Sequence, residues 1–244
     1  MKNYYIYSCK NDLMLDNDIN TDNISVSEYK TNNYIYKTIY FKLLDNNLKE
    51  TLKKELIFFL KLMNISKNDH IFIIGLGNDN HTADSVGPKV LKHIKVNSYL
   101  ENIGIKIDKN KISALEPGVL SETGILTEKI IASVSNEIKP DLIILIDSFV
   151  SDNINYLNKT ISLNNRGLIT GNGIKNINSN IDYDSIGIPV LVIGVTTATL
   201  IKFTDDNDIN YIPYILSTKD IDSYVYNISK IIGSSLNEVI DDLS

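Results

Sequence analysis

Two aspartates, Asp84 and Asp147, each follow an apolar run that predicts a buried strand. Asp84 comes shortly after the run at 71–76, and Asp147 comes directly after the run at 141–146. Because the carboxyl ends of parallel strands meet at one edge of a sheet, we expect the two side chains to approach each other there. Neighbouring carboxylates push their pKa values apart, so one can hold a proton while the other is ionised. Such a pair can activate a water molecule and protonate a leaving group.

The same positions also suit a structural role, and two interpretations of these acids stay open. Aspartate is a favoured helix N-cap, worth about 1 kcal/mol, and Asp84 stands just before an expected helix. Asp147 could cap a turn in the same way. Glu116 follows the expected strand at 111–115, where it is either a third acid of the site or an ordinary loop residue. Spacing alone does not separate catalysis from capping.

A turn with two glycines, Gly75 and Gly77, separates the first strand from the first aspartate. Glycine allows the sharp change of direction that a strand end needs here. The backbone groups between Gly75 and Asn78 could hold the carbonyl group of a substrate. A dinucleotide-binding fingerprint would require a third glycine where Asn80 stands, and no P-loop motif occurs in the chain. We therefore expect no nucleotide site.

Other polar side chains give weaker signals. Thr196 follows a further buried strand and could donate a hydrogen bond to a substrate or cap the next helix. His81 is the histidine nearest to the two acids in sequence. One histidine and two aspartates could bind a metal, but this spacing is not diagnostic, and we expect neither a metal nor a cofactor. The single cysteine, Cys9, excludes an internal disulfide and a cysteine-based zinc cluster.

The elements that must position these residues follow from the hydrophobic pattern. Three of the expected strands are apolar throughout, which is typical of strands covered on both faces. Strands that alternate with helices predict an α/β fold with a mixed, mainly parallel sheet flanked by helices on both faces. The strands are expected at 34–41, 71–76, 111–115, 141–146, 160–163 and 189–195, and the helices at 48–63, 86–96, 123–134 and 220–243.

Length and composition limit the classes of function. The chain has 244 residues and a net charge of −6, which argues against direct nucleic-acid binding through a basic face. No apolar run is long enough to span a membrane, and the first residues do not resemble a signal peptide, so we expect a soluble intracellular protein. Residues 1–30 are expected to be a flexible leader or a propeptide, and 31–244 a single α/β catalytic domain.

The residues around the two aspartates resemble a known family. The blocks G-L-G-N and T-A-D-S-V-G-P within 75–88 are similar to those of the germination protease, the endopeptidase of spore-forming bacteria that degrades small acid-soluble spore proteins. No single block is specific, but the ordered series is. Further blocks of the series lie at 114–119, 139–148, 158–173, 186–197 and 216–225.

The resemblance implies an α/β fold related to the hydrogenase maturation proteases and a catalytic pair that falls on Asp84 and Asp147. It also implies a cytoplasmic enzyme of the spore core that cleaves small acid-soluble spore proteins and contacts neither nucleic acid nor membrane. Members of the family are homo-oligomers, namely tetramers, made as zymogens that cleave their own N-terminus.

The chain departs from the family pattern in two places. The region near 201–212 is shorter than in typical members, and residues 1–20 show no cleavage sequence of the family type. Two other functions therefore stay as alternatives. One is a metal-dependent protease of the maturation type, and the other is a non-catalytic regulatory or binding homologue that keeps the fold.

Overall fold

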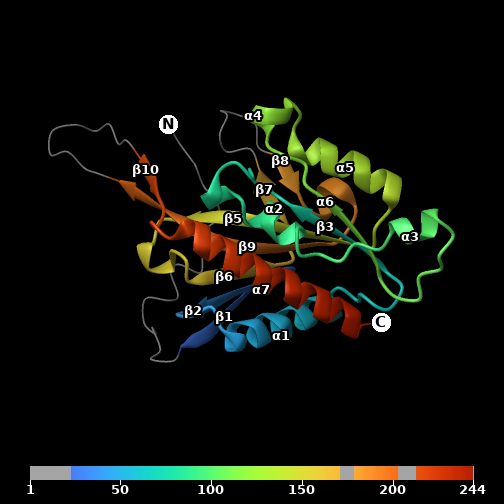
Figure 1. The fold of residues 1–244 in the computed structure, drawn as a ribbon, viewed down its shortest axis with the longest axis horizontal. Coiled ribbons are helices and arrows are strands. Elements are labelled where there is room, and N and C mark those ends of the chain that lie inside the picture. The colour runs from blue at the N-terminus through green and yellow to red at the C-terminus, as the bar shows by residue number, and fades with distance from the viewer. Residues whose placement is uncertain (1–22, 171–178, 203–212, 244) are drawn as a thin grey trace.

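The computed structural model describes residues 23–170, 179–202 and 213–243, and its centre is an eight-stranded sheet (Figure 1). The strands of this sheet are β1 (Ile24–Lys30), β2 (Ile35–Phe41), β3 (His70–Gly75), β4 (Lys111–Leu115), β5 (Leu142–Ser151), β6 (Thr160–Asn164), β9 (Val190–Lys202) and β10 (Pro213–Leu216). Two short strands, β7 (Leu168–Thr170) and β8 (Ser179–Ile181), form a separate ribbon.

The helices complete the fold. They are α1 (Asn46–Leu62), α2 (Val86–Leu91), α3 (Tyr99–Asn102), α4 (Leu120–Thr123), α5 (Thr127–Ile138), α6 (Tyr183–Ile186) and α7 (Ile221–Asp242), with 3₁₀ turns η2 (Thr82–Asp84) and η3 (Ile154–Tyr156). None of the helices within the described residues is long and apolar enough to cross a membrane.

The sheet is mixed, as the sequence predicts. Its strands run in the order β1-β2-β6-β9-β5-β3-β4, and β10 pairs with β9 outside this path. The centre is parallel, because β9, β5, β3 and β4 pair in parallel, whereas β1, β2, β6 and β10 add antiparallel pairs. The carboxyl ends of the parallel strands therefore share one edge, as an α/β site requires.

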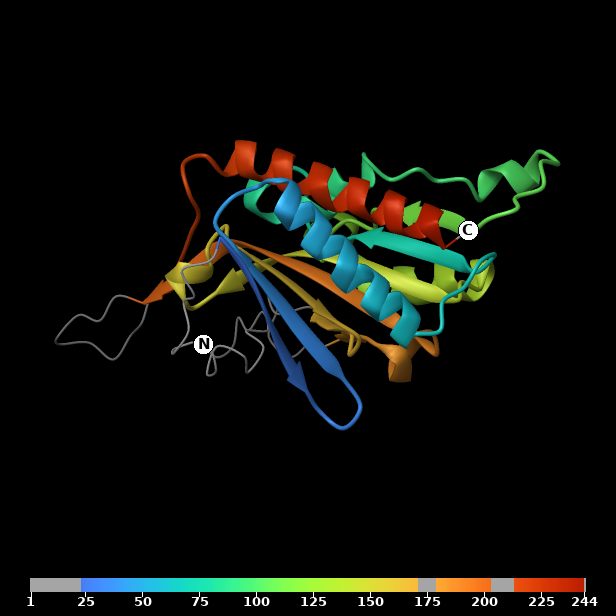
Figure 2. The ribbon, with the colours of Figure 1, turned by 90° about the horizontal axis from the view of Figure 1, so that it is seen from below.

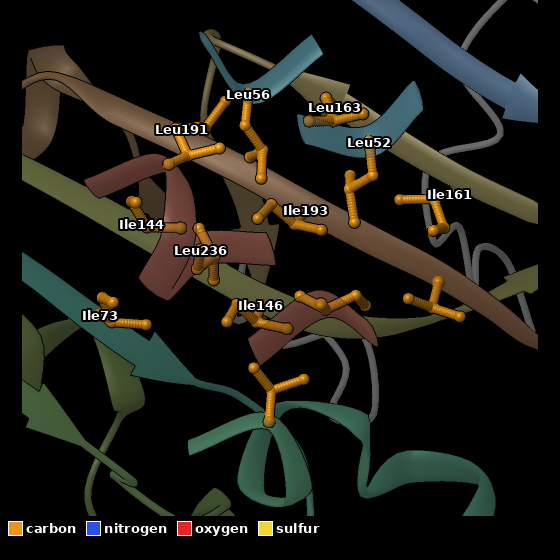
Figure 3. Close-up of a cluster of buried hydrophobic side chains, with 14 of the residues drawn as sticks. Leu52, Leu56, Ile73, Ile144, Ile146, Ile161, Leu163, Leu191, Ile193 and Leu236 are labelled. Atoms are coloured by element: carbon orange, nitrogen blue, oxygen red, sulfur yellow. The ribbon is translucent and has the colours of Figure 1, made fainter. Parts of the chain in front are cut away.

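Hydrophobic side chains cover both faces of the sheet. On one face, α1, α2 and α7 pack against strand residues that are fully buried, and Figure 2 shows α1 and α7 side by side on this face. On the other face, α5 and the β7–β8 ribbon cover a second cluster. Figure 3 shows the first cluster, in which helix residues Leu52, Leu56 and Leu236 meet the strand residues Ile73, Ile144, Ile146, Ile161, Leu163, Leu191 and Ile193.

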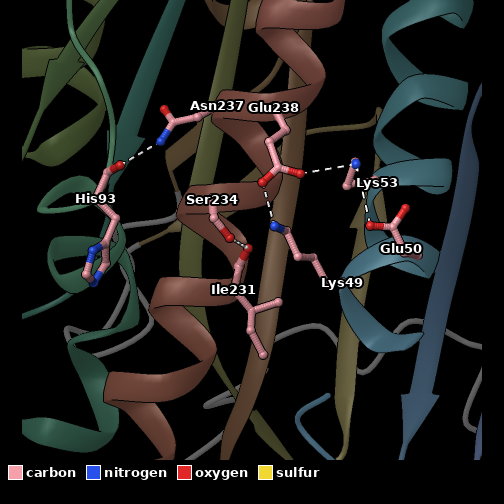
Figure 4. Close-up of polar contacts among 8 residues, drawn as sticks. All are labelled: Lys49, Glu50, Lys53, His93, Ile231, Ser234, Asn237 and Glu238. Atoms are coloured by element: carbon pink, nitrogen blue, oxygen red, sulfur yellow. Dashed lines mark hydrogen bonds and ion pairs between the residues drawn. The ribbon is translucent and has the colours of Figure 1, made fainter. Parts of the chain in front are cut away.

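Polar contacts hold α7 to its neighbours on that face (Figure 4). The Glu238 carboxylate forms ion pairs with Lys49 and Lys53 of α1, at 2.5 and 3.1 Å. The Asn237 side chain donates to the carbonyl oxygen of His93 at 2.8 Å and accepts from the backbone N–H of Lys95 at 3.0 Å. These two bonds take the place of the backbone hydrogen bonds that would otherwise continue α2 as a helix.

The observed boundaries differ from the expected ones for physical reasons. The helix expected at 86–96 ends at Leu91, because Asn237 bonds the backbone that follows. The helix expected at 123–134 begins at Thr127 instead, because Gly124 has a φ of +69° and ends the separate helix α4. Glycine tolerates this left-handed conformation at no steric cost.

The N-terminal region contains more structure than the sequence predicts. The segment 24–30, expected to belong to a loose leader, forms β1 and pairs with β2 along its whole length. Its alternation of partly buried and exposed residues is too weak a pattern to identify a strand, and the pairing with β2 supplies the missing stabilisation. The rest of the expected leader, residues 1–22, lies outside the described residues, and so do residues 203–212 of the shorter region near 201–212.

Candidate active site

Asp84 lies in η2, in the loop that leads from the end of β3 to the start of α2. Its carboxylate accepts a hydrogen bond from the backbone N–H of Asn78 at 3.0 Å, and the same N–H also reaches the carbonyl oxygen of Asp84 at 3.1 Å. The N-cap of α2 is Ser85 rather than Asp84, and no side chain caps this helix. The capping interpretation of Asp84 is therefore wrong, and the carboxylate belongs to the loop.

Asp147 lies inside β5, where we expected it to follow the end of the strand. The strand continues to Ser151 because β9 still pairs with it, whereas β3 stops at Gly75, opposite Ile146. Asp147 is thus the first residue of β5 beyond the end of β3. Its carboxylate accepts a hydrogen bond from the N–H of Ser148 at 2.8 Å. The pairing of β5 explains this position, and no turn is capped there.

The surroundings of Asp147 are apolar on its face of the sheet. Side chains of a strand alternate between faces, so Asp147 shares its face with Leu145 and Phe149, which belong to the second hydrophobic cluster. Its partner in β9 is Gly194, and a Cβ atom there would lie 1.9 Å from the Phe149 ring. The ring therefore fills the space above Gly194, beside Asp147, and excludes water from that side.

Backbone contacts bring the loop of Asp84 onto the end of β5. The N–H of Leu76 donates to the carbonyl oxygen of Ile146 at 2.8 Å, and the N–H of Val86 donates to the hydroxyl of Ser148 at 3.3 Å. Gly87 permits this approach, because a Cβ atom on it would lie 2.6 Å from the carbonyl oxygen of Ile146. The residues on both sides of Asp84 are thus fixed against the residues on both sides of Asp147.

A third strand holds the 3₁₀ turn from the other side. The hydroxyl of Thr197, in β9, is buried and donates to the carbonyl oxygen of Ala83 at 2.6 Å. The hydroxyl of Ser217 in turn donates to the carbonyl oxygen of Thr197 at 2.7 Å. Thr197 directly follows Thr196, which the sequence predicts at this edge, but its bond to the η2 turn depends on a loop path that no periodicity predicts.

Burial raises the pKa values of both aspartates, and the negative charge of Asp84 raises that of Asp147 further. Burial raises the pKa of Asp84 to about 6, opposed by the hydrogen bond from Asn78 and by the charge of His81. Burial, followed by the negative charge of Asp84, raises the pKa of Asp147 to about 7, and the bond from Ser148 opposes this. Near neutral pH the two groups can therefore hold one proton between them, as a general acid and a general base must.

The other residues expected at the site, two glycines and a threonine, lie in different surroundings. Gly77 has a φ of +108°, and a Cβ atom there would lie 1.9 Å from the carbonyl oxygen of Asp84, so only glycine fits. A Cβ atom on Gly75 would lie 2.5 Å from the backbone of Gly87, so this glycine serves the packing of α2 on β3. Thr196 is buried, and its hydroxyl accepts a hydrogen bond from Thr160 at 2.7 Å.

Glu116 is exposed at the same edge of the sheet, just after β4. The hydrogen bond to Asp79 is the main reason that the pKa of Lys92, just after α2, is raised, and the charge of Glu116 adds to this shift. Among the described residues, no hydrogen bond or charge interaction joins Glu116 to either aspartate. Nowhere in the part of the chain that the structure describes do three histidine, cysteine, aspartate or glutamate side chains gather as a metal site would need.

Comparison with known proteins decides the family. A sequence model described as Germination protease matches residues 41–214. The chain belongs to the germination protease family. The matched residues include both aspartates, the glycine turn and the strands of the parallel centre.

Curated germination proteases from several bacteria are similar to this chain. One from Caldanaerobacter subterraneus is 37% identical over 157 residues, which is 63% of this chain and 48% of that protein. One from Priestia megaterium is 34% identical over 163 residues, or 65% of this chain and 44% of that protein. One from Clostridium tetani is 33% identical over 236 residues, or 79% of this chain and 73% of that protein. The chain spans about half the length of the first two germination proteases.

Proposed function

We propose that this chain is an endopeptidase that cleaves small acid-soluble spore proteins during germination, and that Asp84 and Asp147 activate the attacking water. Membership of the germination protease family supports the class of reaction. The observation that carries the mechanism is the packing of the Asp84 loop on β5, through the bonds from Leu76 to Ile146 and from Val86 to Ser148. This packing brings two carboxyl groups with raised pKa values to the carboxyl edge of the sheet. Burial disfavours the charged form of each group, so a shared proton is retained near neutral pH.

In this mechanism Asp84, with the lower pKa of the two, is ionised and accepts a proton from the water. The water oxygen bonds to the scissile carbonyl carbon, and Asp147 gives its proton to the carbonyl oxygen. Collapse of the tetrahedral intermediate breaks the C–N bond, and the proton held by Asp84 passes to the leaving amine. One hydroxyl of the intermediate returns its proton to Asp147 as the carbonyl group of the product acid re-forms. Backbone groups between Gly75 and Asn78 would border the scissile carbonyl, although the N–H of Asn78 is already used by Asp84.

Single substitutions test the pair. Asp84→Asn and Asp147→Asn keep the size of each side chain but remove the proton transfer, which contributes roughly 10² to 10⁴ in rate. We expect each folded variant to lose cleavage of a purified small acid-soluble spore protein by at least a factor of roughly 10². Asp152→Asn is the matched control, because Asp152 is an exposed acid just after the same strand. Near wild-type cleavage by either folded pair variant would refute the mechanism.

A further inference from the structure

The residue that supports Asp84, Asn78, is buried and uses all of its polar groups. Its backbone N–H donates to the Asp84 carboxylate, and its carbonyl oxygen accepts from the N–H of His81 at 3.0 Å. Its side-chain oxygen accepts from the N–H of Asn80 at 2.8 Å. Its side-chain Nδ2 donates to the Glu122 carboxylate at 2.9 Å. The direction of the N–H toward Asp84 is therefore tied to the side chain of the same residue.

Glu122 reaches this loop from a different part of the chain. It lies in α4, which begins shortly after β4, and it is exposed. Positive φ angles at Gly118 (+72°) and Gly124 (+69°) mark the turns on both sides of α4. Besides Asn78, the same carboxylate oxygen also accepts from Nδ2 of Asn80 at 3.3 Å. One carboxylate thus binds two asparagines of the catalytic loop, 44 and 42 residues away in sequence.

We propose that Glu122 is a positioning residue, whose carboxylate holds the side chains of Asn78 and Asn80 and thereby keeps the Asn78 N–H on the Asp84 carboxylate. The role in catalysis rests on the proposed function of Asp84, but the effect on Asp84 itself does not. Glu122 contacts neither aspartate, and it acts through the loop alone. Hydrogen bonds to charged groups are among the stronger ones, so the bonds from Asn78 and Asn80 to the Glu122 carboxylate can hold an exposed loop.

The consequence for Asp84 follows from the sign of each neighbouring charge. The bond from Asn78 and the charge of His81 favour the ionised form of Asp84, whereas a negative charge on Asp147 would oppose it. Lys89 of α2 and Lys92 just after it pair with Asp79, each at 2.7 Å, so neither ion pair involves Glu122. Loss of the Glu122 bonds to Asn78 and Asn80 weakens the bond from the Asn78 N–H to Asp84, so it raises the pKa of Asp84.

A carboxyl ¹³C NMR titration of the full chain tests this directly, without any substrate. In Glu122→Ala we expect the pKa of Asp84 to rise by roughly half a unit or more, the scale of one backbone hydrogen bond to a carboxylate. Glu122→Gln keeps a side-chain oxygen acceptor and should restore most of the wild-type value. Glu137→Ala removes an exposed acid from α5 and should leave Asp84 unchanged. An unchanged Asp84 pKa in folded Glu122→Ala would overturn the proposal.

Cleavage kinetics then test the catalytic part. If Asp84 is the general base, Glu122→Ala should move the acid limb of the pH–rate profile upward and lower kcat more than it changes KM, and Glu122→Gln should reverse both. The two proposals fail differently. An Asp84→Asn variant that still cleaves would refute the aspartate pair while the NMR shift still stood. An unchanged Asp84 pKa in Glu122→Ala, together with an inactive Asp84→Asn variant, would refute only the positioning role of Glu122.

Discussion

At the scale of single residues, burial rather than hydrogen bonding sets the protonation of the two aspartates. Each carboxylate accepts one backbone N–H, which would lower its pKa, and yet the pKa values lie at about 6 and about 7. Desolvation is the largest cause for both, and for Asp147 it comes from a strand covered by Phe149 and its apolar neighbours. An exposed aspartate pair could not retain a proton at neutral pH.

This protonation predicts a bell-shaped dependence of kcat/KM on pH. Activity should rise as the first proton leaves the pair near pH 6 and fall as the second leaves near pH 7, because only the singly protonated pair has both an acid and a base. The measurement is cleavage of a peptide without groups that titrate between pH 5 and 8, with folding followed in parallel. Activity that stays level above pH 8 would contradict a proton held by Asp147.

At the scale of elements, close backbone contact between α2 and the ends of β3 and β5 fixes where the Asp84 loop lies relative to Asp147. A Cβ atom on Gly87 would lie 2.3 Å from the carbonyl oxygen of Leu76 and 2.6 Å from that of Ile146. Both neighbours are backbone atoms, which cannot rotate away as a side chain can. The position of α2, and with it the loop that carries Asp84, therefore depends on the absence of a single methyl group.

Gly87→Ala should accordingly reduce both stability and activity. We expect a loss of roughly 2 to 4 kcal/mol in the free energy of unfolding, measured by urea denaturation, because overpacking here must move the backbone. Gly104→Ala is the control: its φ is +78° but a Cβ atom there meets nothing within 4 Å, so only backbone strain of about 1 kcal/mol is added. Equal losses in the two variants would show that contact with the strands is unimportant.

The elements also show what a sequence can predict. The buried runs that became β3, β5 and β9 were evident because a strand covered on both faces must be apolar throughout. The end of β5 was not evident from the sequence, because Asp147 and Ser148 are polar and only pairing with β9 extends the strand through them. Glu122 gave no signal, because an exposed acid in a four-residue helix has no pattern that indicates its partner. Local pattern predicts elements, but contacts between distant loops complete the site.

At the scale of the whole molecule, β9 is unevenly supported along its length. Val192 and Ile193 are fully buried and lie between β5 and β6. Leu200 and Ile201 are only partly buried and pair with β10, whose residues Tyr214 to Leu216 are exposed. The inner half therefore shares in the core that holds Asp147, whereas the outer half extends beyond it.

Native-state hydrogen exchange should separate these two halves. The amides of Val192 and Ile193 should exchange only through global unfolding, with a free energy equal to that from urea denaturation, because both hydrophobic clusters must open to expose them. The amides of Leu200 and Ile201 should exchange faster, through a local opening that leaves β5 and Asp147 in place. Urea should accelerate the inner amides strongly and the outer ones weakly, since little surface is exposed in a local opening. Identical protection along β9 would instead make the β9–β10 extension part of the cooperative core, and its movement could not then be separated from the integrity of the aspartate pair.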